Sequence, residues 1–287
     1  MPMKHVANQK KAPSSVYLLN VRIDSTSPQK LLNTVAHIVS RSSYNTLFTI
    51  FTPNPEQLVL AQANDHFRST LNQSSLNLPD GMGLVWADRW LSKRRGQFPT
   101  LKRRVTGVDS MQALVAELLI ARVPIFLLGG RGDAAGLAAQ NLITDRAQSG
   151  QNASRSALES LVESSSGSAH IAHETQAERD RVMQKIADHR TKVLFVAYGA
   201  PWQEEWVMAN RDQLVKAGVR VAMVVGGAFD VLAGNARRAP LKWQNFGFEW
   251  LWRLMHEPWR WRRQTALLKF MILVLRQGFI KNYTSVQ

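Results

Sequence analysis

Apolar residues follow two alternating patterns along this chain: short runs rich in β-branched and aromatic residues, and longer stretches in which apolar residues recur at a helical period. The short runs predict strands at residues 16–23, 46–52, 76–78, 124–128, 192–198 and 219–225. The longer stretches predict helices at residues 28–39, 54–71, 110–122, 133–146 and 201–217. Strands that alternate with helices in this way form a mostly parallel sheet with helices on both faces. We therefore expect an α/β fold.

Two segments depart from this alternation. Residues 148–176 are rich in serine and weakly periodic, and we expect a flexible connector there. Residues 237–287 contain ten Lys and Arg, two acidic residues and five of the nine Trp of the chain. The expected organisation is thus a flexible N-terminus at 1–15, an α/β domain at 16–236 and a basic, Trp-rich helical appendage at 237–287.

The composition restricts the partners and the chemistry. Lys and Arg number 36 against 21 Asp and Glu, a net charge of +15, so the expected partners are anionic: nucleic acid, acidic lipid or a phosphorylated ligand. The chain has no cysteine, which excludes disulfides, thiolate metal sites and cysteine nucleophiles. We find neither a signal-peptide pattern nor the roughly 18 consecutive apolar residues of a spanning helix. We expect a cytoplasmic protein, free or attached to a surface.

One candidate catalytic group follows a predicted strand. In parallel sheets, ligands bind at the carboxyl ends of the strands. Asp80 comes directly after the strand at 76–78 and precedes Gly81 and Gly83, which allow close approach of a ligand. A partly desolvated carboxylate in this position can act as a general base toward a hydroxyl group. The alternative is an ordinary turn Asp that caps the next helix.

Three polar residues follow other predicted strands. Thr52 and Asn54 lie on either side of Pro53 and could hydrogen-bond a polar ligand; alternatively, Asn54 is the N-cap of a helix that starts at Pro55. Gln203 lies in the first turn of a helix, where free amides favour a phosphate or sugar oxygen; alternatively, it is an exposed first-turn residue. With neither a zinc-type His cluster nor an Asp-x-Asp pair in the sequence, we expect no metal site.

The C-terminal segment carries candidate phosphate ligands. Arg253, Arg260 and Arg263 share one face on a continuous helix, although Pro258 predicts a turn between two helices. Guanidinium groups beside Trp side chains suit a diphosphate at a membrane interface, and residues 267–280 are apolar enough to lie in that interface. A solvated basic helix packed on the domain and a nucleic-acid-binding surface are the alternatives.

Eight sequence segments, in the same order, resemble motifs of the WecG/TagA/CpsF glycosyltransferases (glycosyltransferase family 26). They are TPN at 52–54, DGMGLV at 80–85, RVTG at 104–107, LLGG at 127–130, GAPWQE at 199–204, VGGAFDVLAG at 225–234, RRAP at 237–240 and EWLWRLMHEPWRWRR at 249–263. The resemblance covers roughly residues 16–265 and implies a Rossmann-like domain with a C-terminal appendage.

The resemblance also implies an activity: inverting transfer of a sugar from a UDP-sugar to a polyprenyl-diphosphate-linked saccharide, without a metal or other cofactor. The donors it implies are UDP-N-acetylmannosamine, its uronic acid or UDP-glucose, and the products are bacterial surface polysaccharides, exopolysaccharides or teichoic-acid-like polymers. The enzyme would be cytoplasmic and peripheral on the inner face of the membrane. Carried over by motif, the catalytic base is Asp80. The sugar- and donor-binding residues would be Thr52, Asn54, Arg104, Gln203 and Asp230. The residues that meet the acceptor diphosphate would be Arg253, Arg260 and Arg263.

The chain departs from the family pattern in three places. Trp202 stands where the family usually has Lys, the serine-rich segment replaces a YP-then-G pattern, and an insertion precedes Arg104. These departures bear on the identity of the donor more than on the reaction class. Two other functions stay open at this point: a nucleic-acid-binding basic α/β protein and a catalytically silent partner in glycan assembly. The sequence also leaves homo-oligomer formation open.

Overall fold

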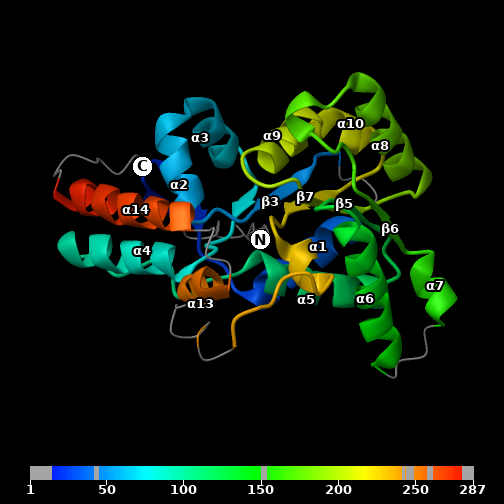
Figure 1. The fold of residues 1–287 in the computed structure, drawn as a ribbon, viewed down its shortest axis with the longest axis horizontal. Coiled ribbons are helices and arrows are strands. Elements are labelled where there is room, and N and C mark those ends of the chain that lie inside the picture. The colour runs from blue at the N-terminus through cyan, green and yellow to red at the C-terminus, as the bar shows by residue number, and fades with distance from the viewer. Residues whose placement is uncertain are drawn as a thin grey trace, which may run out of the picture.

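The computed structural model describes residues 15–41, 45–149, 154–240, 243, 249–256 and 261–279. At its centre lies a six-stranded sheet in the order β4-β3-β8-β7-β5-β6, and every neighbouring pair is parallel (Figure 1). Its strands are β3 (Phe48–Phe51), β4 (Leu76–Asn77), β5 (Ile125–Gly129), β6 (Val162–Ser165), β7 (Val193–Ala197) and β8 (Val221–Val224). The expected α/β, Rossmann-like fold is confirmed.

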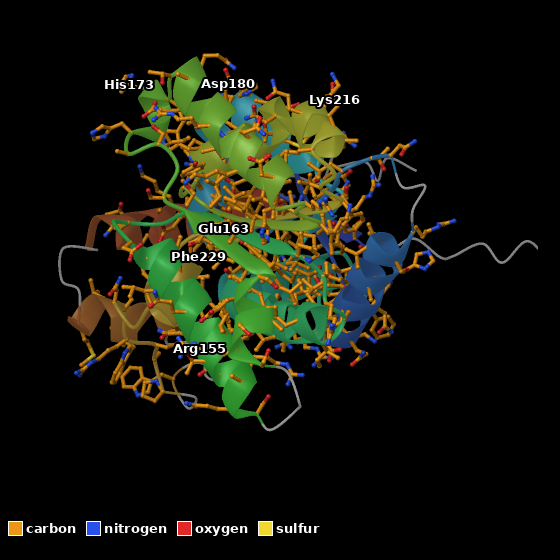
Figure 2. The ribbon with its side chains drawn as sticks, turned by 90° about the vertical axis from the view of Figure 1, so that its right-hand side faces the viewer. Arg155, Glu163, His173, Asp180, Lys216 and Phe229 are labelled. Atoms are coloured by element: carbon orange, nitrogen blue, oxygen red, sulfur yellow. The ribbon has the colours of Figure 1, made fainter. Side chains whose placement is uncertain are left out.

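Helices cover both faces of the sheet because successive strand residues point to opposite sides and both sides are apolar. On β5, for example, Leu127 belongs to one buried cluster, whereas Phe126 and Leu128 belong to the other. One face is covered by α1 (Pro28–Ser40), α5 (Gly107–Ile120), α6 (Ala134–Gln148), α7 (Arg155–Glu159) and α11 (Ala228–Leu232). The other is covered by α2 (Pro55–Ala63), α3 (Asp65–Asn72), α4 (Met82–Arg94), α8 (Gln176–Asp188), α9 (Trp202–Ala209), α10 (Arg211–Lys216) and α14 (Trp261–Phe279). Figure 2 looks at the β6 edge, with Asp180 and Lys216 above Glu163 and Arg155 below it.

The first predicted strand, at 16–23, is instead a two-stranded antiparallel hairpin of β1 (Ser15–Leu18) and β2 (Val21–Asp24). The prediction of a single strand was wrong because Leu19 and Asn20 both have positive φ, of 50° and 62°, and reverse the chain in two residues. The hairpin is fixed to the main sheet by Asp24, whose Oδ2 accepts the backbone N–H of Asn77 at 2.7 Å.

The two longest predicted helices are each divided in two. Asn64 ends α2 and caps α3, because its Oδ1 accepts the backbone N–H of Phe67 at 2.9 Å. Asn210 separates α9 from α10 without a side-chain cap, and its Nδ2 donates to the carbonyl of Trp206 at 2.8 Å. The hydrophobic pattern continues through both breaks, so it does not reveal them.

The serine-rich segment is not a flexible connector over residues 154–176. It forms α7, the edge strand β6 and a 3₁₀ turn, η1 (Ile171–His173). Leu158 and Val162 provide its buried anchors, and β6 pairs in parallel with β5. An edge strand with one buried apolar residue has almost no alternating pattern, which explains why the sequence did not predict it. The expected flexible N-terminus, apart from Ser15, lies outside the described residues.

The C-terminal helix α14 lies beside α2 and α4 (Figure 1). Phe270 and Val274 are fully buried in the same core cluster as the β1–β2 hairpin. The side chain of Gln277 accepts the backbone N–H of Leu19 at 3.1 Å, which joins the two ends of the described chain. A shorter helix, α13 (Glu249–His256), precedes α14. Within the described segments, no helix has the length and apolar character needed to cross a membrane.

Candidate active site

Asp80 lies at the carboxyl end of the sheet, three residues after β4 ends. Its backbone N–H donates to the carbonyl of Pro53 at 3.1 Å, so the loops after β3 and β4 run side by side. The half-buried carboxylate does not cap α4, whose N-cap is Gly81 with φ of 120° and no side-chain bond. Instead, Oδ2 of Asp80 lies 3.5 Å from the backbone nitrogen of Gly107, the first residue of α5. The carboxylate therefore faces the positive end of a helix across the site.

Thr52 and Asn54, the residues predicted to bind the sugar, shape the loop after β3. The hydroxyl of Thr52 is buried and donates to the backbone carbonyl of Val224 on β8 at 3.3 Å. Oδ1 of Asn54 accepts the backbone N–H of Gln57 at 3.0 Å, so Asn54 is the N-cap of α2. The Thr52 side chain thus holds this loop against β8, and the Asn54 side chain fixes the start of α2.

Arg104 lies close to the same edge despite the insertion before it. Val105 donates its backbone N–H to the carbonyl of Pro79 at 2.9 Å, which brings the segment alongside Asp80. Nη1 of Arg104 lies 2.9 Å from Oε2 of Glu249, the first residue of α13, and both side chains are largely buried. This ion pair ties the start of the C-terminal segment to the edge of the sheet.

A second guanidinium group, which sequence reasoning did not identify, completes this charged cluster. Nη1 of Arg238 lies 2.6 Å from Oδ1 of Asp109, whose Oδ2 accepts a hydrogen bond from the hydroxyl of Thr106 at 2.6 Å. Although burial acts to raise it, these hydrogen bonds lower the pKa of Asp109. The hydrogen bond to Asp109 raises the pKa of Arg238, as do the charges of Glu249 and Asp80. The RRAP segment at 237–240 was the available sequence signal for Arg238, but no role was predicted for this residue.

Gln203 is not exposed at the start of α9 but almost completely buried, at 1% exposure. Its Nε2 donates to Oε1 of Glu204 at 2.9 Å, and its Oε1 accepts the backbone N–H of Gly226 at 3.1 Å. The neighbouring Trp202 is exposed. Gln203 thus connects the loop after β7 to the loop after β8.

The remaining predicted residues come from the C-terminal part of the chain. Asp230 is half-buried in the first turn of α11, after β8. The backbones of Arg253 and Arg263 belong to α13 and α14, but the structure does not describe their side chains. Arg260 lies outside the described residues. Diphosphate binding by these arginines stays a prediction.

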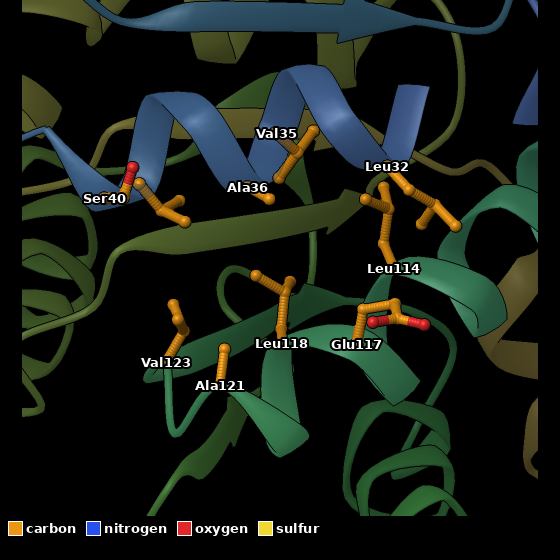
Figure 3. A pocket seen from close by; sticks show the side chains of 10 residues that line it. Leu32, Val35, Ala36, Ser40, Leu114, Glu117, Leu118, Ala121 and Val123 are labelled. Atoms are coloured by element: carbon orange, nitrogen blue, oxygen red, sulfur yellow. The ribbon is translucent and has the colours of Figure 1, made fainter. Parts of the chain in front are cut away.

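A hollow of about 330 Å³ lies elsewhere, between α1 and α5 (Figure 3). Leu32, Val35 and Leu118 are among its mostly apolar lining residues, and no candidate site residue borders it. In the described part of the chain, no three or more His, Cys, Asp or Glu side chains gather in a way that could hold a metal ion.

The buried Glu204 makes stability depend on pH. Burial raises its pKa from 4.5 to about 7, and the like charge of Glu205 adds to this. Between these values the folded chain keeps a proton that the unfolded chain has lost. The free energy of unfolding should therefore fall by roughly 3 kcal/mol as the pH rises through this interval. Urea unfolding at about pH 5 and pH 8 measures the slope. Glu204→Gln should remove most of it, and the control Glu205→Gln should leave most of it in place, because the charge of Glu205 is the smallest cause of the shift. Equal slopes in all three proteins would contradict this assignment.

At the carboxyl edge of this parallel sheet, a carboxylate can accept a proton while two guanidinium groups attract an anionic ligand beside it. Chemistry of this kind is used by Rossmann-like group-transfer enzymes. A family model described as "Glycosyl transferase WecG/TagA/CpsF family" matches residues 16–284, so the chain belongs to this family and is a glycosyltransferase. It is also 29% identical over 231 residues, 79% of either chain, to the N-acetylglucosaminyldiphosphoundecaprenol N-acetyl-beta-D-mannosaminyltransferase of Bacillus subtilis (strain 168).

Proposed function

We propose that this glycosyltransferase moves an N-acetylmannosamine-type sugar from a UDP-sugar to a polyprenyl-diphosphate-linked saccharide in the synthesis of a bacterial surface polysaccharide. The observation that carries the proposal is the placement of the half-buried Asp80 carboxylate at the carboxyl edge of the sheet, in the electrostatic field of Arg238. The name of the Bacillus relative supports both the sugar and the lipid-diphosphate acceptor.

In the proposed mechanism, Asp80 accepts the proton of the acceptor hydroxyl as its oxygen attacks the anomeric carbon. The new carbon–oxygen bond forms opposite the bond to UDP. UDP leaves with the electron pair of the broken bond, and the configuration at the anomeric carbon is inverted. The guanidinium groups at this edge and the amides at helix N-termini are the groups available to stabilise the negative charge of the leaving diphosphate. A metal has no part in this proposal.

The outer face of α14 supports the proposal that the enzyme acts at a membrane surface. Its exposed apolar residues fall at helical spacing and form one stripe, on the side opposite the buried Phe270: Leu268, Met271, Ile272, Leu275 and Phe279. On the adjacent α4, the guanidinium of Arg94 lies 4.5 Å from the ring of Phe279. Trp86 and the half-buried Trp90 extend this surface. Apolar and Trp side chains bordered by basic groups suit the headgroup layer of an anionic bilayer. We call these residues of α14 and α4 the lipid-facing surface.

The test is a panel of UDP-sugars with undecaprenyl-diphosphate-linked N-acetylglucosamine in detergent, followed by measurement of UDP release and of the mass of the lipid product. We expect UDP-N-acetylmannosamine to add one N-acetylhexosamine to the lipid, with full activity in excess EDTA. Its uronic acid and UDP-glucose are the comparison donors. A reaction without lipid separates transfer from donor hydrolysis. If no donor in the panel lengthens the lipid-linked acceptor, the proposed function is wrong; loss of activity in EDTA would overturn metal independence alone.

A further inference from the structure

Three polar side chains are buried together beneath the carboxyl edge of the sheet. Glu204 is fully buried, and Gln203 and Gln57 are nearly so. Oε1 of Glu204 accepts two hydrogen bonds, from Nε2 of Gln57 at 3.1 Å and from Nε2 of Gln203 at 2.9 Å. Burying polar groups is costly unless they are paired. Oε1 of Glu204 pairs the two amide N–H groups, whereas Oε2 of Glu204 and Oε1 of Gln57 are buried without a hydrogen-bond partner among the described residues.

The cluster connects three loops that are far apart in the sequence. Gln57 lies in the first turn of α2, directly after the loop that carries Thr52 and Asn54. Gln203 and Glu204 lie in the first turn of α9, after β7. Through Gln203, the cluster also reaches the backbone N–H of Gly226, which follows β8. One carboxyl group therefore links the loops after β3, β7 and β8.

Glu204 also determines how the amide of Gln203 is oriented. Because Oε1 of Glu204 accepts a hydrogen bond, Gln203 must direct its N–H group to Glu204 and its carbonyl oxygen to Gly226. Without an acceptor at position 204, either orientation of the amide leaves a buried donor unpaired. The amide of Gln203 then loses the partner that holds it in place, which weakens its hydrogen bond to the Gly226 N–H. Such turns at strand ends are where a parallel sheet binds its ligand.

We propose that Glu204 is a positioning residue for the transfer reaction, which holds Gln203 and the Gly226 turn in the arrangement that forms the donor pocket. This rests on the proposed function, since the donor pocket is defined by that reaction. Glu204 itself touches no substrate. Its effect passes through Gln203 to Gly226, and through Gln57 to the loop that ends at Asn54.

The test compares Glu204→Leu, which removes the acceptor, with Glu204→Gln, which keeps one, and with the half-buried Glu205→Leu as a matched control in the same turn. We expect Glu204→Leu to raise the KM for the UDP-sugar by about tenfold, the effect of one buried hydrogen bond, with kcat changed much less. Glu204→Gln and Glu205→Leu should stay near the wild-type KM. Hydrogen exchange at the Gly226 amide should accelerate by about tenfold in Glu204→Leu alone among the three variants.

Gln203→Leu is the second variant, because it cuts the link to Gly226 but leaves the pair of Glu204 and Gln57. It should accelerate exchange at Gly226 at least as much, because it removes the acceptor of the Gly226 N–H itself, and it tests that last link if Glu204→Leu does not fold. Unchanged exchange at Gly226 in a folded Glu204→Leu or Gln203→Leu protein overturns the proposal, as does a wild-type KM in folded Glu204→Leu. If the wild-type chain turns over no UDP-sugar, the proposed function fails, whereas exchange at Gly226 still tests Glu204.

Discussion

Replacing Asp80 with Asn is expected to lower kcat for sugar transfer by about a thousandfold, the middle of the range for loss of a general base. The amide has nearly the same size and can still face the backbone N–H of Gly107. It cannot accept the proton of the acceptor hydroxyl. Binding of UDP should therefore stay close to that of the wild type. Single-turnover transfer to the lipid acceptor measures the loss, and calorimetry measures the affinity for UDP.

The control for this variant is Asp133→Asn, which removes an exposed carboxylate after β5 at the same edge of the sheet. It should leave kcat unchanged. A similar loss in both variants would point to the general charge of the edge rather than to a base. Normal turnover in Asp80→Asn would show that another group takes the proton.

The second large effect is expected from charges placed on the lipid-facing surface. Leu268 and Ile272 are 63% and 52% exposed and lie one helical turn apart on α14. Burial of a side chain of this size in an apolar layer contributes about 1.5–3 kcal/mol. The double change Leu268→Glu and Ile272→Glu should therefore weaken binding to anionic vesicles by about a hundredfold or more. Co-sedimentation with phosphatidylglycerol-containing liposomes measures this.

Leu137→Glu is the matched control, because Leu137 is a part-exposed leucine on α6, which covers the other face of the sheet. It should bind vesicles as the wild type does. UDP release with a short, water-soluble acceptor should be normal in the double variant, because the change leaves the buried face of α14 intact. If the double variant binds vesicles as strongly as the wild type, α14 does not contribute to membrane attachment.

The alternation of apolar runs was sufficient to predict the sheet, because a buried parallel strand such as β5 or β7 consists almost entirely of apolar residues. It was not sufficient where one or two residues decide the structure. The positive φ of Leu19 and Asn20 turned one predicted strand into a hairpin, and Asn64 divided one predicted helix. The serine-rich strand β6 pairs through its backbone, which sequence patterns do not report.

The sequence was sufficient to predict those parts of the candidate site that depend on residues close together in the chain. The position of Asp80 follows from a strand, a turn and two glycines within a few residues of sequence. The ion pair of Arg104 with Glu249 joins residues 145 positions apart, and no spacing rule predicts such a partner. Glu204 was missed because a first-turn Glu is normally solvated, and only tertiary packing buries it.

The central claim is that Asp80 receives the proton of the acceptor hydroxyl, and a structure with UDP and the lipid-diphosphate saccharide bound tests it most directly. We predict that the reacting hydroxyl lies about 3 Å from a carboxylate oxygen of Asp80, on the side of the donor site away from the diphosphate of UDP. A saccharide bound with that hydroxyl turned away from Asp80, against another proton acceptor, would contradict the account.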